Sequence, residues 1–326
     1  MSRPIVVVNR NARNLREEGP LLDALRDARS ADVLLRETRS FDDLAEVCGD
    51  IAARDVLAVV LAGGDGTAMA GLSALRRAFA GRPLPEIAIV PGGTVCTIGR
   101  NFGIRGNRAS YTQKLLRALV RGTSRRVAVR PLLLREGTHD GLDRPGDPQT
   151  ERMGFIFGFG LVSAFFEAYY ADRSDRSALG LAAAARIVAE VFGGSFVGGR
   201  LARRVLDAQP AELVVDGHAI PHDGYSLFVA SVVRDLGLHM HLTYRAGERI
   251  DRFHAVGSAL GPAALGPQMP LVLAGKKLRG AGVDVLASRV DVRFVGERRG
   301  YVLDGELFLA DRVSVTCGED VTLRFV

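Results

Sequence analysis

The chain has 326 residues, 47% of them hydrophobic and 25% charged, which is typical of a globular protein with one large domain or two domains. The three cysteines, Cys48, Cys96 and Cys317, form no C-x-x-C pair, so neither a cysteine zinc site nor a disulfide framework is expected. The net charge of +6 is a mild excess, and aromatic residues make up only 6% with no tryptophan, so we expect no nucleic-acid partner.

The sequence gives no sign of a membrane-spanning segment. No signal peptide is evident at the N-terminus, and the longest stretch without a charged residue, Phe253 to Gly275, contains three prolines. Proline interrupts helices, so this stretch is not expected to cross a bilayer. The unpaired cysteines suit a reducing compartment. We therefore expect a cytoplasmic protein that associates peripherally with the inner membrane face, and a homodimer is left open.

Short apolar runs alternate with helical patterns over the first 125 residues. Apolar runs of this length predict strands, and apolar residues at helical spacing predict helices. The expected strands are Ile5 to Val8, Ala31 to Leu35, Val56 to Ala62 and Ile87 to Val90, and the expected helices are Gly19 to Arg29, Phe41 to Ala53, Ala68 to Ala80 and Tyr111 to Arg121. This alternation predicts a doubly wound α/β domain, in which helices cover both faces of a parallel sheet.

The pattern changes after about Val127, where strands dominate. Helices are expected only at Leu161 to Tyr170 and Ser177 to Leu206. The expected strands are Pro131 to Leu134, Gly154 to Phe159, Ala211 to Val215, Tyr225 to Val233, Leu271 to Leu273, Val290 to Val295, Val302 to Leu303 and Val313 to Cys317. The second half is therefore expected to be a β-rich, antiparallel, sandwich-like domain.

The strongest chemical signal follows the third strand. Here Gly63, Gly64, Asp65, Gly66 and Thr67 stand directly before a helix. Glycines let backbone N–H groups approach an anion, and a helix N-terminus attracts phosphate. Thr67 is expected to cap the helix, while the Asp65 carboxylate suits a Mg²⁺ ion beside a triphosphate. A simple tight turn would not need three glycines around an acid.

Two further motifs accompany it. Pro91-Gly92-Gly93-Thr94 ends the fourth strand, so Thr94 can contact phosphate or ribose in the same cleft. Asp304-Gly305-Glu306 lies between two late strands. Two carboxylates there can serve as general base and metal partner, although an Asp-Gly pair is also a favourable hairpin turn.

Together these motifs resemble the diacylglycerol kinase catalytic family, which includes sphingosine kinases and bacterial lipid kinases. Residues 63–67 match its G-G-D-G-T motif, Pro91, Gly93 and Thr94 its P-x-G-T motif, and residues 304–306 its D-G-E motif. Asn9 matches the start of its N-P-x-S-G motif, and Thr38 matches a recurrent threonine of its nucleotide site. The order and spacing of the matches extend over nearly the whole chain.

The resemblance implies an ATP- and Mg²⁺-dependent lipid kinase with two domains. Residues 1–126 would bind the nucleotide, with a C-terminal tail from about residue 306 returning to them, and residues 127–305 would bind the lipid. ATP would contact Asn9, Arg10, Thr38, Gly63, Gly64, Asp65, Gly66, Thr67, Gly93 and Thr94, with Asp65 as the metal ligand and a catalytic residue. Glu306, with Asp304 as its partner, would accept the proton of the lipid hydroxyl.

The sequence also departs from the family pattern. The first loop lacks the family's proline, serine and glycine, although Arg10 or Arg13 can still meet phosphate. Cys96-Thr97 stand where the family has Asn-Asp, and Ala246 to Arg249 carry no aspartate for a second structural Mg²⁺. A degenerate, non-catalytic nucleotide- or lipid-binding regulator stays open as an alternative, as does an NAD kinase-like enzyme that shares G-G-D-G. Diacylglycerol, a sphingoid base, ceramide and phosphatidylglycerol are all candidate acceptors.

Overall fold

A computed structural model describes residues 3–28, 32–138, 141–142, 150–171, 186–190, 192–194, 199, 206–296 and 299–326. The chain divides into two compact units. Unit 1 comprises residues 1–131 and 319–326, and unit 2 comprises residues 132–318. The sequence placed these boundaries near residues 126 and 306. Strands β18 (Glu306–Ala310) and β19 (Arg312–Cys317) instead pair within unit 2, so the return to unit 1 begins at Glu319.

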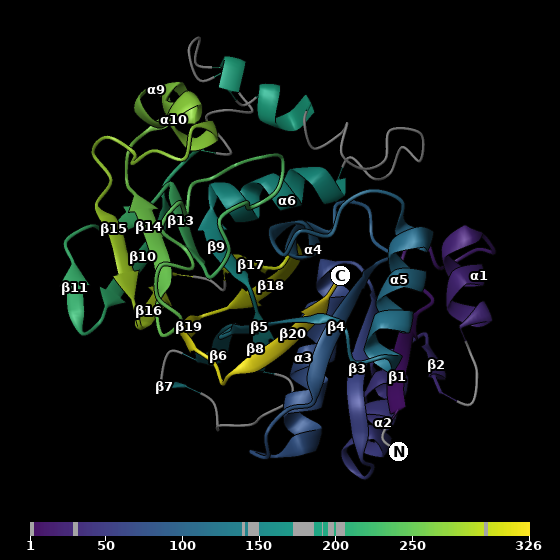
Figure 1. The fold of residues 1–326 in the computed structure, drawn as a ribbon. Coiled ribbons are helices and arrows are strands. Elements are labelled where there is room, and N and C mark those ends of the chain that lie inside the picture. The colour runs from purple at the N-terminus through teal and green to yellow at the C-terminus, as the bar shows by residue number, and fades with distance from the viewer. Residues whose placement is uncertain are drawn as a thin grey trace. The chain divides into compact units, whose positions relative to one another are not determined.

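Unit 1 is built on a six-stranded sheet in the order β2-β1-β3-β4-β20-β5 (Figure 1). Its strands are β1 (Arg3–Asn9), β2 (Leu34–Thr38), β3 (Val56–Gly63), β4 (Glu86–Pro91), β5 (Arg125–Val129) and β20 (Val321–Phe325). Strands β1 to β4 and β20 run parallel, and β5 is antiparallel. The parallel α/β sheet expected from the sequence is confirmed, with β2 starting three residues later than predicted.

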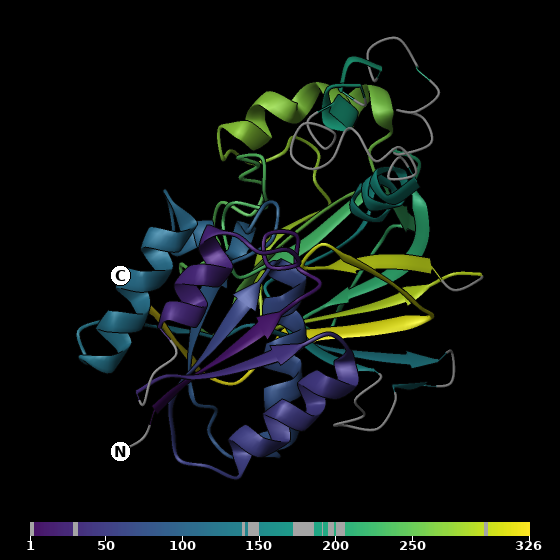
Figure 2. The same cartoon turned by 90° about the vertical axis from the view of Figure 1, so that its right-hand side faces the viewer.

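Helices cover both faces of this sheet. They are α1 (Pro20–Asp27), α2 (Phe41–Ala52), α3 (Asp65–Phe79), α4 (Thr97–Asn101) and α5 (Arg108–Val120). Helix α1 packs on α5, and α2 packs on α3 across the sheet from that pair (Figure 2). Ser40 begins α2 with a capping box, because its side chain accepts the Asp43 N–H while the Asp43 carboxylate accepts the Ser40 N–H.

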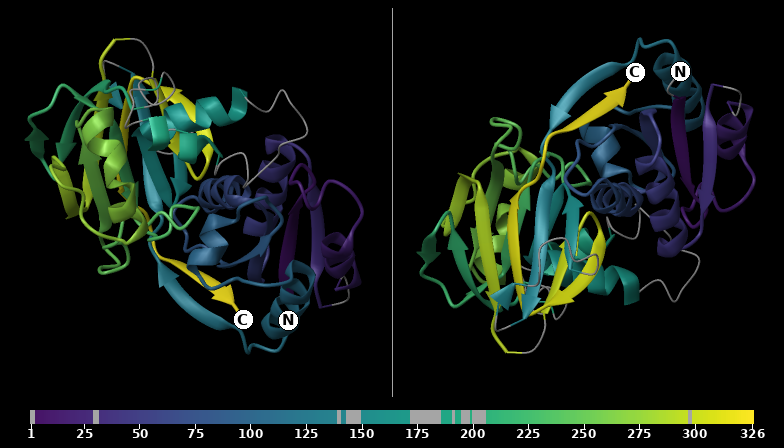
Figure 3. Two further views of the ribbon diagram at one scale, coloured as in Figure 1. Left: turned by 90° about the horizontal axis from the view of Figure 1, so that it is seen from above. Right: turned by 90° about the horizontal axis from the view of Figure 1, so that it is seen from below.

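The C-terminal strand β20 completes the unit 1 sheet. It pairs in parallel with β4 and in antiparallel with β5, so the last residues of the chain lie inside the sheet (Figure 3). Arg324 on this strand is only 2% exposed. Its guanidinium donates to the Ser124 hydroxyl (2.7 Å) and pairs with Glu86 on β4. A buried guanidinium needs such partners, and this one ties the returning strand to its neighbours.

Unit 2 consists mainly of two antiparallel sheets. One has the order β11-β10-β16-β19-β6-β7, with β12 beside β10 and β8 beside β6, and the other has the order β15-β14-β13-β9-β17-β18. Besides β18 and β19, the strands are β6 (Leu132–Thr138), β7 (Gly141–Leu142), β8 (Glu151–Gly154), β9 (Ile156–Gly160), β10 (Gln209–Val215), β11 (His218–Ile220), β12 (Gly224–Tyr225), β13 (Leu227–Ser231), β14 (Phe253–Ser258), β15 (Val283–Ala287), β16 (Arg289–Phe294) and β17 (Arg299–Leu303). The predicted β-rich second half is confirmed.

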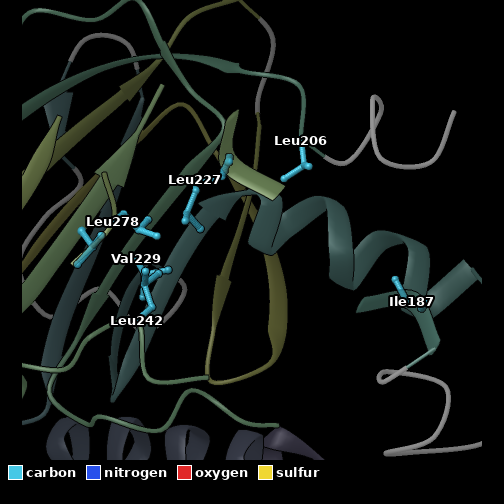
Figure 4. Close-up of a cluster of buried hydrophobic side chains, with 8 residues drawn as sticks. Ile187, Leu206, Leu227, Val229, Leu242 and Leu278 are labelled. Atoms are coloured by element: carbon cyan, nitrogen blue, oxygen red, sulfur yellow. The ribbon is translucent and has the colours of Figure 1, made fainter. Parts of the chain in front are cut away.

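Helix α6 (Leu161–Ala171) confirms the helix predicted at Leu161 to Tyr170. It packs on the second of these sheets, and a buried apolar cluster forms beside it. Figure 4 shows Leu227, Val229, Leu242 and Leu278 of this cluster. The sequence prediction was wrong at residues 271–273. They belong to helix α10 (Met269–Leu273), which follows α9 (Pro262–Leu265) and a 3-10 turn (Gly266–Gln268). Prolines at the first turn of each piece favour helix starts, and an apolar triplet alone cannot distinguish strand from helix.

One further expectation cannot be compared with the structure. The helix expected at Ser177 to Leu206 falls mostly outside the described residues. Within it the structure describes residues 186–190, 192–194, 199 and 206, and the first two of these pieces are helical.

Candidate active site

Four strands of unit 1 end at one edge of the sheet. The residues at their carboxyl ends are Thr38 on β2, Asn9 on β1, Gly63 on β3 and Pro91 on β4. Asn9 lies opposite Thr38 on the adjacent strand, and Gly63 lies opposite Pro91. The carboxyl edge of a parallel sheet is where α/β proteins bind ligands. The structure therefore brings the G-G-D-G-T and P-x-G-T motifs together, as expected from their adjacent strand ends. It also places Asn9 and Thr38, which were assigned from the family resemblance, at the same edge.

The first loop is joined directly to the G-G-D-G-T segment. Asn9 Nδ2 donates a 2.8 Å hydrogen bond to Thr67 Oγ1, and Asn9 Oδ1 accepts from the Asn11 N–H at 2.9 Å. The expected cap role of Thr67 is wrong, because α3 begins at Asp65 and its N-cap is Gly64. Gly66 and Thr67 therefore lie in the first turn of the helix. The Thr67 N–H donates to the Gly64 carbonyl at 3.1 Å, and the N–H groups before it lack intrahelical acceptors.

Glycines allow the G-G-D-G-T and P-x-G-T loops to touch. The N–H groups of Gly92 and Gly93 both donate to the Gly63 carbonyl, at 2.7 and 3.1 Å. A Cβ placed on Gly93 would lie 2.5 Å from Gly64 Cα, and one placed on Gly63 would lie 2.2 Å from Thr67 Oγ1. Real side chains do not pack this closely, so the loops can meet only where glycine stands.

Asp65 connects these loops through its side chain. Its Oδ2 accepts the Thr97 N–H at 2.8 Å and its Oδ1 accepts the Ile98 N–H at 2.9 Å. Desolvation raises the pKa of Asp65, and the two N–H donors and the nearby Arg100 guanidinium partly oppose that shift. Asp65 thus lies in the first turn of α3 instead of on the expected loop, and its carboxylate holds the N-terminus of α4. Each oxygen retains a lone pair for a further contact.

Arg10 is a cationic residue of the first loop that lies beside Thr38. Its backbone N–H donates to the Thr38 carbonyl (2.9 Å), and its side chain is 10% exposed. The guanidinium lies 3.5 Å from Glu37 and donates to the Arg16 carbonyl at 3.2 Å. Its Nε and Nη1 have no hydrogen-bond acceptor among the described residues. Glu37 and Glu18, 3.5 and 3.9 Å away, already pair with this guanidinium, and its Nε donor is the one that fits a further anionic ligand such as a nucleotide phosphate.

A cavity of about 440 Å³ adjoins these loops within unit 1. It is lined by residues 13–14, 17–21 and 107–109. Asn14 also donates through Nδ2 to the Gly92 and Gly93 carbonyls, and Arg108 donates to the Thr94 carbonyl at 3.4 Å. The sequence analysis missed Asn14, Asn107 and Arg108. Only the helix-start pattern at Asn107, which caps α5 through the Ser110 N–H, marked that place in the chain.

The Asp304-Gly305-Glu306 motif lies in unit 2, at the hairpin between β17 and β18. Asp304 and Gly305 both have positive φ (49° and 87°), which is the geometry of a two-residue hairpin turn. Asp304 is 5% exposed, and its carboxylate accepts the N–H groups of Phe155 (3.0 Å) and Ile156 (2.9 Å). These backbone donors tie the Asp304 carboxylate to the start of β9, so Asp304 anchors the turn.

Glu306 differs from Asp304 in its surroundings. It is the first residue of β18, opposite Leu303, and it is exposed. Tyr170 on α6 donates to the Gly305 carbonyl at 2.7 Å and so fixes the turn that positions Glu306. Of the two predicted carboxylates, Glu306 is therefore the one accessible to a substrate hydroxyl, and its role as general base stays a prediction.

The parallel sheet, its glycine loops and the half-buried Asp65 form an α/β domain whose strand ends suit a phosphate-bearing ligand. The family model of the diacylglycerol kinase catalytic domain matches residues 3–130. This match covers the segment that contains the first-loop, G-G-D-G-T and P-x-G-T motifs, and it confirms the resemblance inferred from them. No curated protein matches the chain.

Solved structures share the fold across both units. A Bacillus anthracis str. Sterne protein described as a diacylglycerol kinase superposes with a TM-score of 0.67 at 16% identity, covering 100% of this chain and 97% of that one. Another diacylglycerol kinase structure from the same organism gives a TM-score of 0.58 at 15% identity, with coverages of 100% and 97%. Yeast NADH kinase complexed with NADH gives 0.53 at 11% identity, with coverages of 100% and 84%. At these identities the likeness concerns the fold alone.

Proposed function

We propose that this protein is an ATP-dependent lipid kinase that transfers the γ-phosphate to a hydroxyl group of diacylglycerol or a related lipid. The observation that carries the proposal is the Asp65 carboxylate, which joins the G-G-D-G-T segment to the start of α4, just after the P-x-G-T loop, through the Thr97 and Ile98 N–H groups. The two glycine loops therefore lie at one edge of the sheet. Phosphoryl transfer depends mainly on positioning and charge stabilisation of the phosphates, and loops in this arrangement can supply both.

The nucleotide would lie along the loop edge of unit 1. The N-terminal turn of α3 and Arg10 would meet phosphate oxygens, and Arg13 and Arg108 line the adjoining cavity with two more guanidinium groups. Mg²⁺ would supply charge neutralisation for the phosphates, with Asp65 as the side chain that holds it. This chain's contribution is to orient the phosphates between rigid glycine turns.

The lipid acceptor would present its hydroxyl to Glu306 as the general base. An exposed carboxylate on a hairpin anchored by Asp304 and Tyr170 can take that proton without leaving its place. Diacylglycerol is the first acceptor to test, followed by a sphingoid base, ceramide and phosphatidylglycerol.

The purified protein should be incubated with labelled ATP, Mg²⁺ and a total lipid extract, in parallel with NAD and NADH as acceptors. The proposal expects label in a lipid, lost on removal of Mg²⁺ and in Asp65→Ala. Label in the dinucleotide alone would assign the NAD kinase-like alternative, and ATP binding without any transfer would assign the degenerate regulator.

We also propose that the protein meets its lipid as a peripheral membrane protein. No helix among the described residues is long and apolar enough to span a bilayer, and the net charge is +6. Attraction of this kind weakens with salt, because the Debye length is about 8 Å at physiological ionic strength. High salt should release the protein from anionic vesicles, whereas retention until detergent is added would contradict the idea.

A further inference from the structure

The segment between β13 and β14 in unit 2 gathers three metal-ligating side chains. The ligand atoms of Asp235, His239 and His241 all lie within 4.8 Å of one another. Oδ2 of Asp235 lies 3.8 Å from Nδ1 of His239, and the two imidazole rings are nearly parallel with centroids 6.5 Å apart. None of these residues belongs to the motifs considered above, and no cysteine takes part. We propose that they form a binding site for one divalent transition-metal ion.

The backbone of this segment is shaped to bring the three side chains together. The Leu236 N–H donates to the Met240 carbonyl at 2.9 Å, so the chain doubles back and places Asp235 and His241 at the two ends of a tight loop. Leu238 and His239 both have positive φ, at 53° and 57°. Two successive side-chain-bearing residues in this region are uncommon. This conformation turns His239 back towards the ends of the loop.

Neighbouring groups hold two of the three ligands in position. Oδ1 of Asp235 accepts the Gly237 N–H at 2.8 Å, and Oδ2 lies 3.8 Å from Nδ1 of His239. The His241 N–H donates to the Val272 carbonyl on α10 at 3.1 Å. Gly275, just beyond that helix, approaches so closely that a Cβ there would lie 3.4 Å from His241 Cβ. Such supporting contacts orient ligands and tune affinity in metal sites.

The distances require only a small adjustment. Metal–ligand bonds of about 2.0–2.2 Å in a tetrahedral site separate neighbouring ligand atoms by about 3.4 Å. The Asp235–His239 pair at 3.8 Å is close to that value. The His239 side chain is 81% exposed, so it is free to rotate and the site is open to an ion from solvent. Asp235 is mostly buried at 16% exposure and would remain the fixed member.

The donor set determines the class of ion. Two imidazole nitrogens and one carboxylate oxygen suit Zn²⁺, Co²⁺, Ni²⁺ or Fe²⁺, whereas Mg²⁺ and Ca²⁺ prefer oxygen ligands alone. Three protein ligands leave a coordination position for water. This site is therefore chemically distinct from the Mg²⁺ site proposed at Asp65, and it does not depend on the proposed kinase function.

The test uses the full-length protein without an affinity tag, stripped of metal with a chelator that is then removed. Zn²⁺ alone is titrated by calorimetry in wild type, His239→Ala, Asp235→Asn and His218→Ala. His218 is the matched control, because it is an exposed histidine on β11 outside the site. The expected result is one Zn²⁺ per chain, with affinity weakened about tenfold or more in the first two variants and unchanged in His218→Ala. Millimolar Mg²⁺ should not displace the bound Zn²⁺.

Co²⁺ gives a second, spectroscopic measurement. Bound at this site, it should show an intense visible absorption band typical of four-coordinate Co²⁺, and Zn²⁺ should remove that band. Matching thermal unfolding of metal-free His239→Ala and wild type shows that the fold is intact, and Zn²⁺ should raise the unfolding midpoint of wild type only. Absence of 1:1 binding in wild type, or equal Zn²⁺ affinity in wild type and His239→Ala, would overturn the proposal.

Discussion

Oδ1 of Asp65 accepts a 2.9 Å hydrogen bond from the backbone N–H of Ile98, which connects the first turn of α3 to the start of α4. The same carboxylate accepts the Thr97 N–H through its other oxygen. The acidic residue of the glycine loop is therefore part of the framework of the site, and a substitution there should alter stability as well as phosphoryl transfer.

Asp65→Ala is expected to abolish transfer and to lower the free energy of unfolding by about 2 kcal/mol, because two backbone N–H groups lose a charged acceptor. Chemical denaturation and the lipid kinase assay measure the two effects. Asp55→Ala is the matched control, since Asp55 is exposed and lies outside the site. A variant with full stability and normal activity would show that neither the link nor the metal assignment is correct.

Gly93→Ala should separate the two glycine loops. Its Cβ would lie 2.5 Å from Gly64 Cα, and backbone cannot give way as a flexible side chain can. We expect ATP affinity to fall about tenfold or more, corresponding to about 1.4 kcal/mol, measured by calorimetry. In Gly49→Ala, a Cβ meets nothing within 4 Å and the residue lies inside α2, so this control should instead stabilise the protein by about 1 kcal/mol. Unchanged ATP binding in Gly93→Ala would mean that contact between the loops is not needed for nucleotide binding.

The two carboxylates of the hairpin should respond differently to removal of their charge. Glu306→Gln is expected to lower turnover by about 10²–10⁴ with the free energy of unfolding changed by less than about 0.5 kcal/mol, because Glu306 is exposed. Asp304→Asn should instead lower that free energy by about 1–3 kcal/mol, because the Phe155 and Ile156 N–H groups lose their charged acceptor. Turnover and denaturation of both variants decide the matter. Normal turnover in Glu306→Gln would place the general base elsewhere.

Acidification is expected to destabilise the protein through His254. This imidazole is fully buried, its Nε2 lies 2.8 Å from Asp284 Oδ1, and its Nδ1 faces the Arg245 N–H at 3.3 Å. Burial lowers the pKa of His254 below its ordinary value of 6.5, although Asp284 opposes that shift. At a pH between the folded-state pKa of His254 and 6.5, the unfolded chain binds more protons than the folded chain. The stability that the neutral, buried His254 contributes is therefore complete above pH 6.5 and is lost as the pH falls.

Denaturation midpoints measured from pH 7.5 downwards check this expectation. His254→Gln should reduce the loss of stability below pH 6.5, and His218→Gln, which replaces an exposed histidine, should leave it unchanged. An identical pH profile in wild type and His254→Gln would show that another group governs acid sensitivity.

The sequence by itself determined the local chemistry of unit 1. Apolar runs at Val56 to Ala62 and Ile87 to Val90 end in glycine motifs, and parallel strands place their carboxyl ends on one sheet edge. The meeting of these loops could therefore be predicted. The roles of individual side chains could not, because they depend on residues far away in the chain. Asp65 turned out to hold Ile98, and Asp304 turned out to hold Phe155 and Ile156, a use of acidic groups that a motif does not reveal.

Other features were decided only by tertiary structure. Residues 271–273 form helix because prolines begin each turn around them, although their apolar run suited a strand. The C-terminal strand β20 entered the unit 1 sheet because its backbone N–H and C=O groups pair with β4 and β5, contacts that no local pattern records. His239 and His241 lie close to Asp235 only because the backbone reverses between them, so cysteine counting gave no sign of this histidine and aspartate cluster. Side-chain spacing determines local elements, whereas long-range contacts determine which polar groups share a site.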